Sequence, residues 1–473
     1  MRDKTNPFWH KPILWILVAS TFLRLASAFY QGDAVTPMPG VHDQISYEAL
    51  ALRIVDGHGF SFGSNWWPAT AANEPTAHWS FLYTLYLALI YLICGPHPLA
   101  ARLVQAFVAG IIHPWLVWRI GNRFFSQRVA LIASLMVSSY TYFVFYSGAL
   151  MTETFYILVI LWTFDAASRL RRKTGASRPA LSVLTDKKQK VTQSTNWIIY
   201  MELGIAIGIA VLLRQVFLLF VPILLGWAIW QTRPQPAQLR PQTLLSGPLF
   251  GHHLGQVRGP LLSVAVILLL IAPWTIRNYR AFDSFVLLNT NAGFAFFWGN
   301  HPIHGDEFVP ILPTSYGELI PDELRGLNEA EMDRWLLRKG LEFIAADPVR
   351  FSLLSLSRLQ EYFKFWPTSQ SGFLSNLSRI TSFGLSLPLI LIGLGVRFRR
   401  IRWKEPGSSG WILMLSFVVF NTLIHLLSWS LIRYRLPIDT FLLFFAALGV
   451  TSLYDAIRAR VPSPQFLTAG VKR

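Results

Sequence analysis

The sequence has few charged residues, one cysteine and none of the common nucleotide or zinc motifs, and each shortage excludes a class of protein. Charged residues make up 14% of the 473 positions and hydrophobic residues 53%, whereas an ordinary soluble domain is about 25% charged. A single cysteine, Cys94, excludes an internal disulfide and a cysteine-based metal centre. No glycine-rich phosphate loop, metalloprotease helix or zinc-binding spacing is present. The composition therefore indicates a membrane protein.

Acidic residues are also scarce, with 25 Asp and Glu against 42 Lys and Arg, which gives a net charge of +17. In a soluble protein this excess would suggest a nucleic-acid partner. Here the basic residues gather in particular short loops between apolar segments. We therefore expect these basic loops to lie next to a lipid bilayer and not to bind nucleic acid.

Ten segments have roughly the length and apolarity of membrane-spanning helices, which need about 20 mostly apolar residues. They are residues 12–30, 99–118, 128–146, 153–168, 197–213, 216–231, 259–276, 380–396, 410–428 and 436–454. The sequence thus predicts an all-α polytopic membrane protein with about ten transmembrane helices.

The Lys and Arg residues orient these helices, because short loops rich in them stay in the cytoplasm. The stretches concerned are 119–128, 169–196, 232–258 and 397–405. The two long loops would then face outward, the first (31–98) with five acids and one base and the second (277–378) with twelve acids and nine bases. Both chain ends would be cytoplasmic.

This orientation divides the chain into three parts. Residues 1–276 would form an N-terminal transmembrane module with the catalytic outer loop 31–98. Residues 277–379 would form a small outward-facing subdomain, and residues 380–473 the C-terminal transmembrane helices and a cytoplasmic tail.

Three helices are expected outside the spans. Residues 44–55 have an amphipathic pattern, and residues 328–345 have a helical one. Residues 81–93 are apolar and aromatic but short, and a span there would push the basic loop 119–128 outside. We therefore predict that this segment lies as a helix in the outer membrane interface.

Asp43 is the sharpest candidate for chemistry, because it follows the first membrane exit and would lie at the outer rim. A carboxylate partly removed from water can accept the proton of an acceptor hydroxyl as that oxygen attacks an anomeric carbon. Asp43 is equally well placed as the N-cap of the helix that starts near Gln44. The two interpretations are compatible, and the sequence does not choose between them.

Two further acids lie in the predicted span 153–168. Glu153 would be at its outer mouth, where an acid is a functional suspect or a first-turn residue favoured by the helix dipole, with Thr152 as the cap. Asp165 lies near the cytoplasmic end of the same helix, where we expect a structural ion pair with a nearby arginine.

Five arginines lie at or near outer helix ends, against the usual charge bias. Each is explained by a side chain that reaches the membrane surface. Together they suggest a site for a lipid-borne phosphate, because guanidinium groups bind phosphate with paired hydrogen bonds. They are Arg24, Arg214, Arg277, Arg433 and Arg435.

The histidines have no helical or clustered spacing that would indicate a metal site, and an ordinary hydrogen-bonded role is expected for each. His42 and His78 share the first loop with Asp43. The aromatic pair Trp66-Trp67 and the run from Phe294 to Trp298 fit either sugar stacking or a membrane-interface belt. We favour the belt.

Several motifs occur in a consistent order along the chain. They are Asp43 with Tyr47 and Gly57-His58-Gly59-Phe60, Glu74-Pro75-Thr76-Ala77, Met151-Thr152-Glu153-Thr154, Leu213-Arg214, Ala272-Pro273-Trp274-Thr275-Ile276-Arg277-Asn278-Tyr279, Asn291-x-Gly293, Trp298-Gly299-Asn300-His301-Pro302 and Arg433-Tyr434-Arg435-Leu436-Pro437. Through nearly its whole length the chain resembles the GT-C superfamily of polytopic glycosyltransferases, in particular bacterial relatives of protein O-mannosyltransferases and aminoarabinose transferases.

The resemblance implies an inverting transfer from a polyprenyl-phosphate sugar with Asp43 as the base, on the periplasmic or extracellular face of the plasma membrane. Our hypothesis adds Glu153 as a second catalytic residue. It assigns the donor phosphate to Arg433 and Arg435, with Arg214 or Arg277, and assigns further substrate contacts to Tyr47, His42, His78 and Asn300. The sequence leaves open whether a divalent cation assists.

Two departures from the family pattern leave the acceptor unassigned among lipids, glycans and proteins. His78-Trp79-Ser80 stands where many relatives have an Arg-Pro-Pro-Gly-Tyr-Pro-like run. Gln44 follows Asp43, where eukaryotic protein mannosyltransferases have Glu.

Two other classes compete with a transferase. A transporter or lipid flippase would use the arginines to hold its substrate and would have charged or broken segments in mid-membrane. A scaffold for envelope assembly would tolerate neutralisation of Asp43 and the arginines together. The clustering of the candidate residues on the outer side favours surface chemistry.

Overall fold

The computed structural model describes residues 10–37, 42–170, 182–232, 249–311, 316–369, 371–399 and 408–460. Residues 171–181, 233–248 and 400–405 of the predicted cytoplasmic stretches, and the end of the predicted tail, lie outside these residues.

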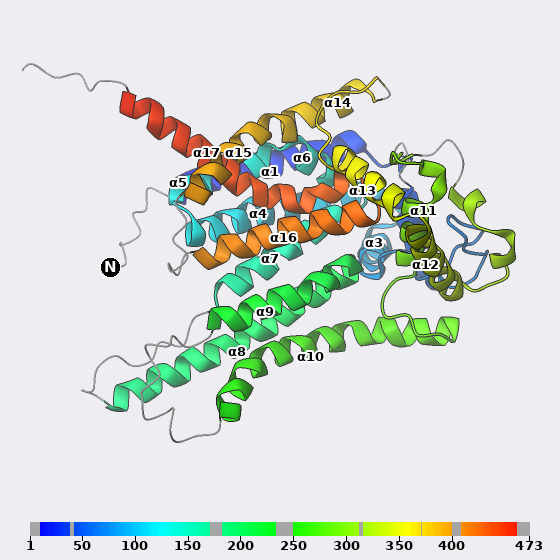
Figure 1. The fold of residues 1–473 in the computed structure, drawn as a ribbon, viewed down its shortest axis with the longest axis horizontal. Helices are drawn as coiled ribbons and strands as arrows, with labels where there is room; N and C mark the ends of the chain where they lie inside the picture. The colour runs from blue at the N-terminus through cyan, green and yellow to red at the C-terminus, as the bar shows by residue number, and fades with distance from the viewer. Residues whose placement is uncertain are drawn as a thin grey trace, which may run out of the picture.

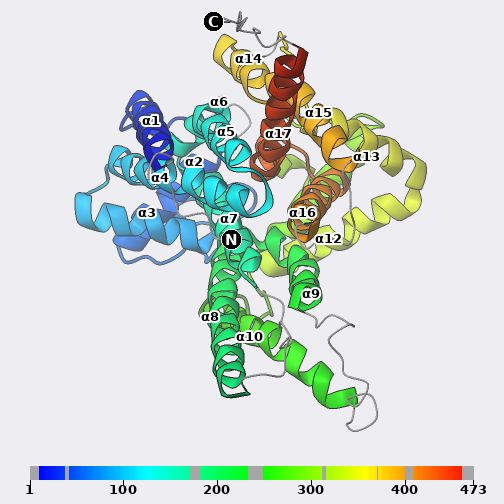
Figure 2. The ribbon, with the colours of Figure 1, turned by 90° about the vertical axis from the view of Figure 1, so that its left-hand side faces the viewer.

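A bundle of long helices forms the body of the molecule (Figure 1). Its helix α7 lies centrally in the end-on view and packs on α4, α8 and α17 (Figure 2). The bundle helices are α1 (His10–Gln31), α4 (Pro98–Phe124), α5 (Gln127–Ser139), α6 (Thr141–Gly148), α7 (Glu153–Ser168), α8 (Ser182–Leu213), α9 (Val221–Thr232), α10 (Leu249–Phe282), α15 (Leu385–Arg399), α16 (Ser408–Leu427) and α17 (Leu436–Arg460).

Shorter helices gather at one end of this bundle (Figure 1). They are α2 (Asp43–Val55), α3 (Phe81–Cys94), α11 (Ala292–Asn300), α12 (Glu329–Ala346), α13 (Pro348–Tyr362) and α14 (Phe373–Arg379). Among the described residues, α1 begins and α17 ends at the opposite end of the bundle (Figure 1).

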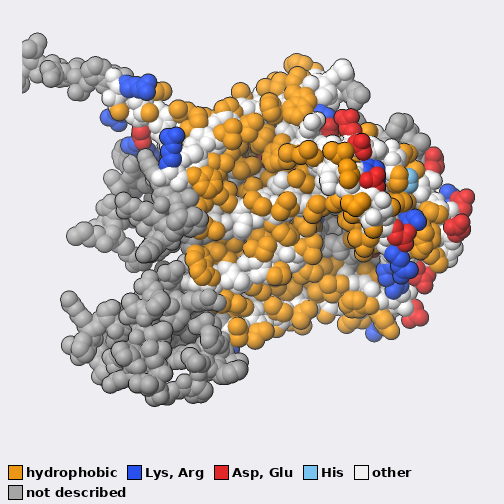
Figure 3. Space-filling model, viewed as in Figure 1, with side chains coloured by type: hydrophobic (Ala, Val, Ile, Leu, Met, Phe, Trp, Pro, Cys, Tyr) orange, Lys and Arg blue, Asp and Glu red, His pale blue; other side chains and the backbone are white. Residues whose placement is uncertain are grey.

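Eight helices in the described part of the chain are long and apolar enough to cross a membrane, or nine if the bent pair α5 and α6 is one span. The one predicted span that is not among these helices, residues 153–168, forms α7, which has 16 residues and is buried along most of its length. Apolar side chains cover the middle of the molecule, and charged ones gather towards its ends (Figure 3). The predicted polytopic all-α architecture is therefore confirmed.

The predicted helices outside the spans are also present. The amphipathic helix is α2, the short apolar helix is α3 with 14 residues, and the helix in the second loop is α12. Asn328 caps α12, because its side-chain oxygen accepts a hydrogen bond from the backbone N–H of Glu331.

The predicted span 128–146 is broken at Tyr140, where α5 and α6 meet at 52°. A break inside an apolar bundle leaves backbone carbonyls without their helical partners. Arg24 of α1 takes up two of them, with Nη2 donating to the Val137 carbonyl at 3.0 Å and Nη1 to the Ser138 carbonyl at 3.4 Å. Arg24 is fully buried, so both the membrane-surface and the phosphate interpretations of this residue are wrong.

A carboxylate in α12 joins the two outer loops. Glu329 accepts hydrogen bonds from the hydroxyls of Thr70 (2.9 Å) and Thr76 (2.7 Å) and the backbone N–H of Ala77 (2.8 Å), all in the first loop. It also accepts one from the Thr290 hydroxyl in the second loop. Four donors satisfy a carboxylate that is only 6% exposed, so the loops form one cap over the bundle end.

The aromatic run in α11 forms a small second core with α12 and the preceding turns. Phe294, Phe297 and Trp298 are at most 4% exposed and pack with Leu336. The membrane-belt interpretation is therefore wrong for these three residues. Gly293 allows the close contact of the two helices, because a side chain there would collide with the backbone of Asp333.

Asp333 should make the stability of this second core depend on pH. Burial raises the pKa of its carboxyl to about 7 from 3.8. The folded state thus holds the proton more tightly. The contribution of Asp333 to the free energy of unfolding is therefore greatest below about pH 4 and falls as the pH rises to about 7. Asp333→Asn keeps the oxygen that accepts the Gly293 N–H at 2.7 Å, and it should flatten this part of the profile. Thermal unfolding of purified protein between pH 4 and 8 measures the slope.

The matched control is Asp322→Asn, which removes an exposed carboxylate from the same loop and should leave the slope unchanged. An identical slope in wild type and Asp333→Asn would show that Asp333 does not titrate in this range.

Candidate active site

Four charged side chains from distant parts of the sequence meet at the capped end of the bundle, and we call them the charged cluster: Asp43, Glu153, Arg214 and Arg433. Arg433 Nη1 contacts Asp43 Oδ2 and lies 3.3 Å from Glu153 Oε1. Arg214 Nη2 donates to the same Glu153 oxygen at 2.6 Å. The order of contacts is therefore Asp43, Arg433, Glu153, Arg214, with alternating charge.

Each member of the charged cluster stands at a helix end. Asp43 and Glu153 are the first residues of α2 and α7. Arg214 follows α8, and Arg433 lies in the short 3-10 helix η9 (Ile432–Arg435) before α17. The ends of four separate helical segments therefore bring these side chains together at one place.

Burial distinguishes the two acids. The Glu153 side chain is 1% exposed, while that of Asp43 is 21% exposed. Among the described residues, Glu153 Oε2 and Arg433 Nε are buried and have no hydrogen-bond partner. The charged cluster thus has an open side at Asp43 and unused hydrogen-bonding capacity inside.

Asp43 is not the N-cap of α2, whereas the predicted first-turn position of Glu153, directly after Thr152, is confirmed. The N-cap of α2 is His42, with no side-chain capping bond, and Asp43 lies in the first turn, where its carboxylate binds Arg433. Thr152 precedes Glu153 but makes no side-chain capping bond. Its hydroxyl accepts a hydrogen bond from Arg214 Nε at 2.7 Å instead.

The ring of Tyr434 contacts both arginines of the charged cluster. The guanidinium carbons of Arg214 and Arg433 lie 5.2 Å and 5.0 Å from the centre of its ring. Such contacts stabilise a cation on an aromatic face, and here they hold two like charges close together. Tyr47 of α2 packs against Tyr83, and burial raises the pKa of its hydroxyl, which therefore stays protonated.

Two predicted phosphate ligands lie outside the charged cluster. Arg435 is fully buried, with Nε 3.0 Å from Asp439 Oδ1 and Nη1 donating to the Tyr362 carbonyl at 2.9 Å. Arg277 donates to the carbonyls of Thr76 and Phe60 at 2.7 Å and 3.0 Å, and so holds the first loop. In the structure both residues therefore bind neighbouring protein groups, and neither contacts the two acids of the charged cluster.

The predicted substrate contacts also divide. Asn300 is fully buried and binds the Phe296 carbonyl and Arg358, away from the charged cluster. His42 stays exposed and stacks on Trp67 at 6.2 Å. His78 is 7% exposed, and burial lowers its pKa, so it is neutral. Its Nδ1 has no partner in the described part of the chain.

Comparison with solved structures identifies this arrangement of helices. The oligosaccharyltransferase of Archaeoglobus fulgidus in the apo form matches 96% of this chain and 51% of its own length, with 12% identity and a TM-score of 0.56. The same protein in complex with an inhibitory peptide and a dolichol-phosphate, where it is called AglB, matches 97% of this chain and 52% of its own, with 13% identity and a TM-score of 0.53.

The protein has the GT-C fold. This confirms the fold predicted from the resemblance. The chain spans about half the length of the Archaeoglobus oligosaccharyltransferase that it matches. ArnT from Cupriavidus metallidurans bound to undecaprenyl phosphate aligns with 97% of this chain and 81% of its own at 12% identity, and its TM-score of 0.36 is too low to compare residues.

Sequence comparison agrees with the GT-C fold over part of the chain. The family model described as dolichyl-phosphate-mannose-protein mannosyltransferase matches residues 78–177. That stretch contains Glu153 but neither Asp43 nor the two cluster arginines. No curated protein matches the chain significantly.

In the described part of the chain, the two acids of the charged cluster share an arginine rather than a third metal-ligating side chain. Among the described residues there is no group of three or more His, Cys, Asp or Glu side chains that could hold a metal. The two cluster acids are instead bridged by the guanidinium of Arg433.

Gln44 adjoins the charged cluster, and its contacts were not predicted from the sequence. It is 4% exposed, and its Oε1 accepts hydrogen bonds from the Leu150 N–H at 2.8 Å and from Arg102 at 3.2 Å. Gln44 adjoins Asp43, and Leu150 lies three residues before Glu153. Gln44 therefore links the segment that carries Asp43 to the segment that carries Glu153.

Loss of this acceptor oxygen should slow catalysis. Gln44→Leu is expected to lower kcat by roughly 10- to 100-fold with little change in the donor KM, because a small misplacement of reacting groups is enough. Gln44→Glu should restore most of the rate, since a carboxylate also accepts from Leu150 and Arg102. Steady-state kinetics with each variant test this. Gln231→Leu, in the distant helix α9, is the matched control, and equal loss in both Gln44 variants would contradict the role.

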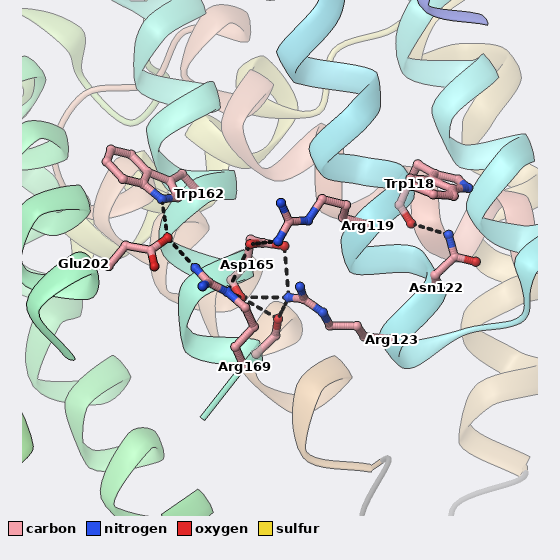
Figure 4. A network of polar contacts seen from close by, with 9 residues as sticks. Trp118, Arg119, Asn122, Arg123, Trp162, Asp165, Arg169 and Glu202 are labelled. Atoms are coloured by element: carbon pink, nitrogen blue, oxygen red, sulfur yellow. Dashed lines mark hydrogen bonds and ion pairs between the residues drawn. The ribbon is translucent and has the colours of Figure 1, made fainter. Parts of the chain in front are cut away.

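The predicted ion pair of Asp165 is confirmed at the other end of α7, in a larger network (Figure 4). Its carboxylate lies 3.0 Å from Arg119, 2.9 Å from Arg123 and 3.4 Å from Arg169. Arg169 also binds Glu202 of α8. The network ties together α4, α7 and α8, and it holds α7 at the end opposite to Glu153.

Proposed function

We propose that this protein is an inverting glycosyltransferase that moves a sugar from a polyprenyl-phosphate donor to a hydroxyl of a lipid, glycan or protein acceptor. The observation that carries the proposal is a partly exposed carboxylate, Asp43, in contact with Arg433, while Glu153 holds Arg433 and Arg214 together. The GT-C fold supports it, as do the family model, whose description names a dolichyl-phosphate donor, and the dolichol-phosphate complex of the Archaeoglobus protein.

In the proposed reaction the acceptor oxygen attacks the anomeric carbon of the donor as the bond from that carbon to the phosphate oxygen breaks. The proton of the acceptor hydroxyl passes to Asp43. The bonding electrons leave with the polyprenyl phosphate, and Arg433 and Arg214 stabilise the negative charge that develops there. Attack from the face opposite the leaving group inverts the anomeric configuration without a covalent enzyme intermediate.

Glu153 takes no proton in this scheme. It is almost fully buried and contacts both Arg214 and Arg433. We assign it to hold the two guanidinium groups at a spacing that one phosphate can bridge.

We place the charged cluster on the periplasmic or extracellular side of the plasma membrane. Glu153 and Asp165 are twelve residues apart on α7, which is about 18 Å along a helix. The Asp165 end carries Arg119, Arg123 and Arg169, and arginine-rich short loops stay in the cytoplasm. The charged cluster therefore belongs to the outer side.

The test is transfer in proteoliposomes from radiolabelled polyprenyl-phosphate sugars, hexoses and pentoses in turn. The acceptors are envelope lipids, glycans and proteins from a strain that lacks this protein. We expect label in one acceptor class and the opposite anomeric configuration in the product. Retained configuration, or no transfer from any donor to any fraction, would contradict the proposal.

A flippase of a phosphorylated lipid or glycan is the second candidate, and the break between α5 and α6 beside buried Arg24 favours it. The Arg24 guanidinium is, however, occupied by two backbone carbonyls and by Ser20 and His113. Movement of labelled donor across the bilayer of the same liposomes, without covalent change, would support this candidate over the transferase.

A further inference from the structure

Arg433 is required for two purposes that conflict. In the proposed function its guanidinium binds the donor phosphate, yet in the ligand-free structure its Nη1 contacts the carboxylate of Asp43, the proposed base. A carboxylate engaged by a guanidinium is poorly placed to take a proton from an acceptor. The ligand-free contact therefore blocks the chemistry that the site is proposed to perform.

The charge balance of the charged cluster sharpens the conflict. Two acids face two arginines, so the ligand-free cluster is neutral. A phosphodiester adds one negative charge, and it must share arginines that are already paired. Arg214 is held by Glu153 and by the Thr152 hydroxyl, and Glu153 is buried. Asp43 is the more exposed acid, so its contact is the one that can be exchanged at least cost in desolvation.

Arg433 also has the means to make the exchange. Its Nε has no partner among the described residues, and its Nη2 reaches only the Tyr434 hydroxyl, at 3.4 Å. The Tyr434 ring supports the guanidinium from the side at 5.0 Å, and this contact does not depend on Asp43. The guanidinium can thus turn from a carboxylate to a phosphate while its aromatic support stays in place.

We propose that Asp43 and the donor phosphate compete for Arg433, so that donor binding releases Asp43 to act as the base. The inference rests on the proposed function, because it takes a polyprenyl phosphate as the ligand. It makes the site self-ordering: the base becomes available only when the sugar it serves is present. No bond is made or broken in this exchange, and the proton moves only in the later transfer step.

The competition predicts an effect opposite to that of an ordinary binding-site mutation. Asp43→Asn removes the competing charge, so it should tighten binding of polyprenyl phosphate although it slows catalysis. Coupling between two sites is typically about 5- to 150-fold in affinity, and we expect Kd to fall by at least about fivefold. The probe is undecaprenyl phosphate, titrated into full-length protein in lipid nanodiscs.

The matched control is Asp33→Asn, the same substitution in the same loop. Asp33 is half exposed and pairs with His97 outside the charged cluster, so Kd should stay within about twofold, as general charge effects at the surface are small. Asp43→Ala, which also removes the competing charge, provides a second variant with the same expectation. Both variants are first compared with wild type by size exclusion and thermal unfolding.

A reciprocal measurement uses wild type alone. By linkage, undecaprenyl phosphate should free Asp43 to the same extent as Asp43 weakens its binding. Labelling of the Asp43 carboxyl by a carbodiimide and an amine, read by peptide mass spectrometry, should therefore rise when the lipid is added. Labelling of Asp33 in the same sample should not change.

The outcomes separate this inference from the proposed function. If wild type binds undecaprenyl phosphate and the Asp43 variants bind it equally or more weakly, the competition is refuted and the transferase proposal stands. If wild type does not bind the lipid at all, the proposed donor class is wrong.

Discussion

Asp43→Asn is expected to lower the rate of sugar transfer by about 10²–10⁴-fold, the usual contribution of a positioned general base. The amide keeps the shape of the side chain and its place in the first turn of α2, but it has no negative charge to receive the acceptor proton. Arg433 would also keep its contacts with Glu153 and Tyr434. The loss should therefore appear in kcat, while the donor KM does not rise. Initial rates in the proteoliposome assay, with donor and acceptor varied in turn, measure it.

Two further variants make this result specific. Asp56→Asn removes an exposed acid just beyond α2 and should leave the rate unchanged. Arg433→Lys keeps the positive charge but loses the planar fork that grips phosphate, so it should raise the donor KM as well as lower kcat. A rate for Asp43→Asn close to wild type would remove Asp43 from the mechanism, whatever the other variants do.

The sequence predicted local features of this protein well. The apolar runs and the charge of the loops gave the helical bundle and the cap, because each signal lies within about 20 neighbouring residues. The ion pair between Asp165 and Arg169, four residues further along the chain, followed for the same reason. These are features that a short window contains.

The charged cluster could not be predicted from such short stretches of sequence. Asp43 and Arg433 are 390 positions apart, and no periodicity in either segment says that they touch. The arginines at outer helix ends looked alike in the sequence, yet only Arg214 and Arg433 bind the cluster acids. One signal could have predicted the ion pair of Arg435. Asp439 stands four residues after it, a spacing that favours an ion pair along a helix.

The burial of polar residues in the cap was also not predicted from the sequence. Glu329 and Gln44 looked like surface residues of amphipathic helices, but both are buried hubs of hydrogen bonds between loops. Their partners are hydroxyls and backbone groups, which every sequence has in abundance. The hydrogen bond from Arg358 to the side-chain oxygen of Asn300 was likewise not visible in the sequence, because the two residues are 58 positions apart.

The largest expected loss of stability comes from the opposite end of α7. Asp165 is 2% exposed and lies within 3.4 Å of three arginines. Asp165→Asn would leave these guanidinium groups facing one another without their shared anion. Removal of one partner from a buried ion pair costs about 3–5 kcal/mol, and the roughly 30% exposure of the arginines moves the expected cost towards the lower end through solvent screening.

We therefore expect Asp165→Asn to lower the yield of folded protein and its unfolding temperature in detergent, measured by intrinsic fluorescence. Asp455→Asn is the matched control, because it breaks a pair with Arg128 in which both side chains are 65% exposed, and it should melt like wild type. The folded fraction of Asp165→Asn should still bind undecaprenyl phosphate, since Glu153 and its two arginines lie at the other end of the helix. Unchanged stability would mean that packing of α4 and α8, and not the ion network, holds α7 in place.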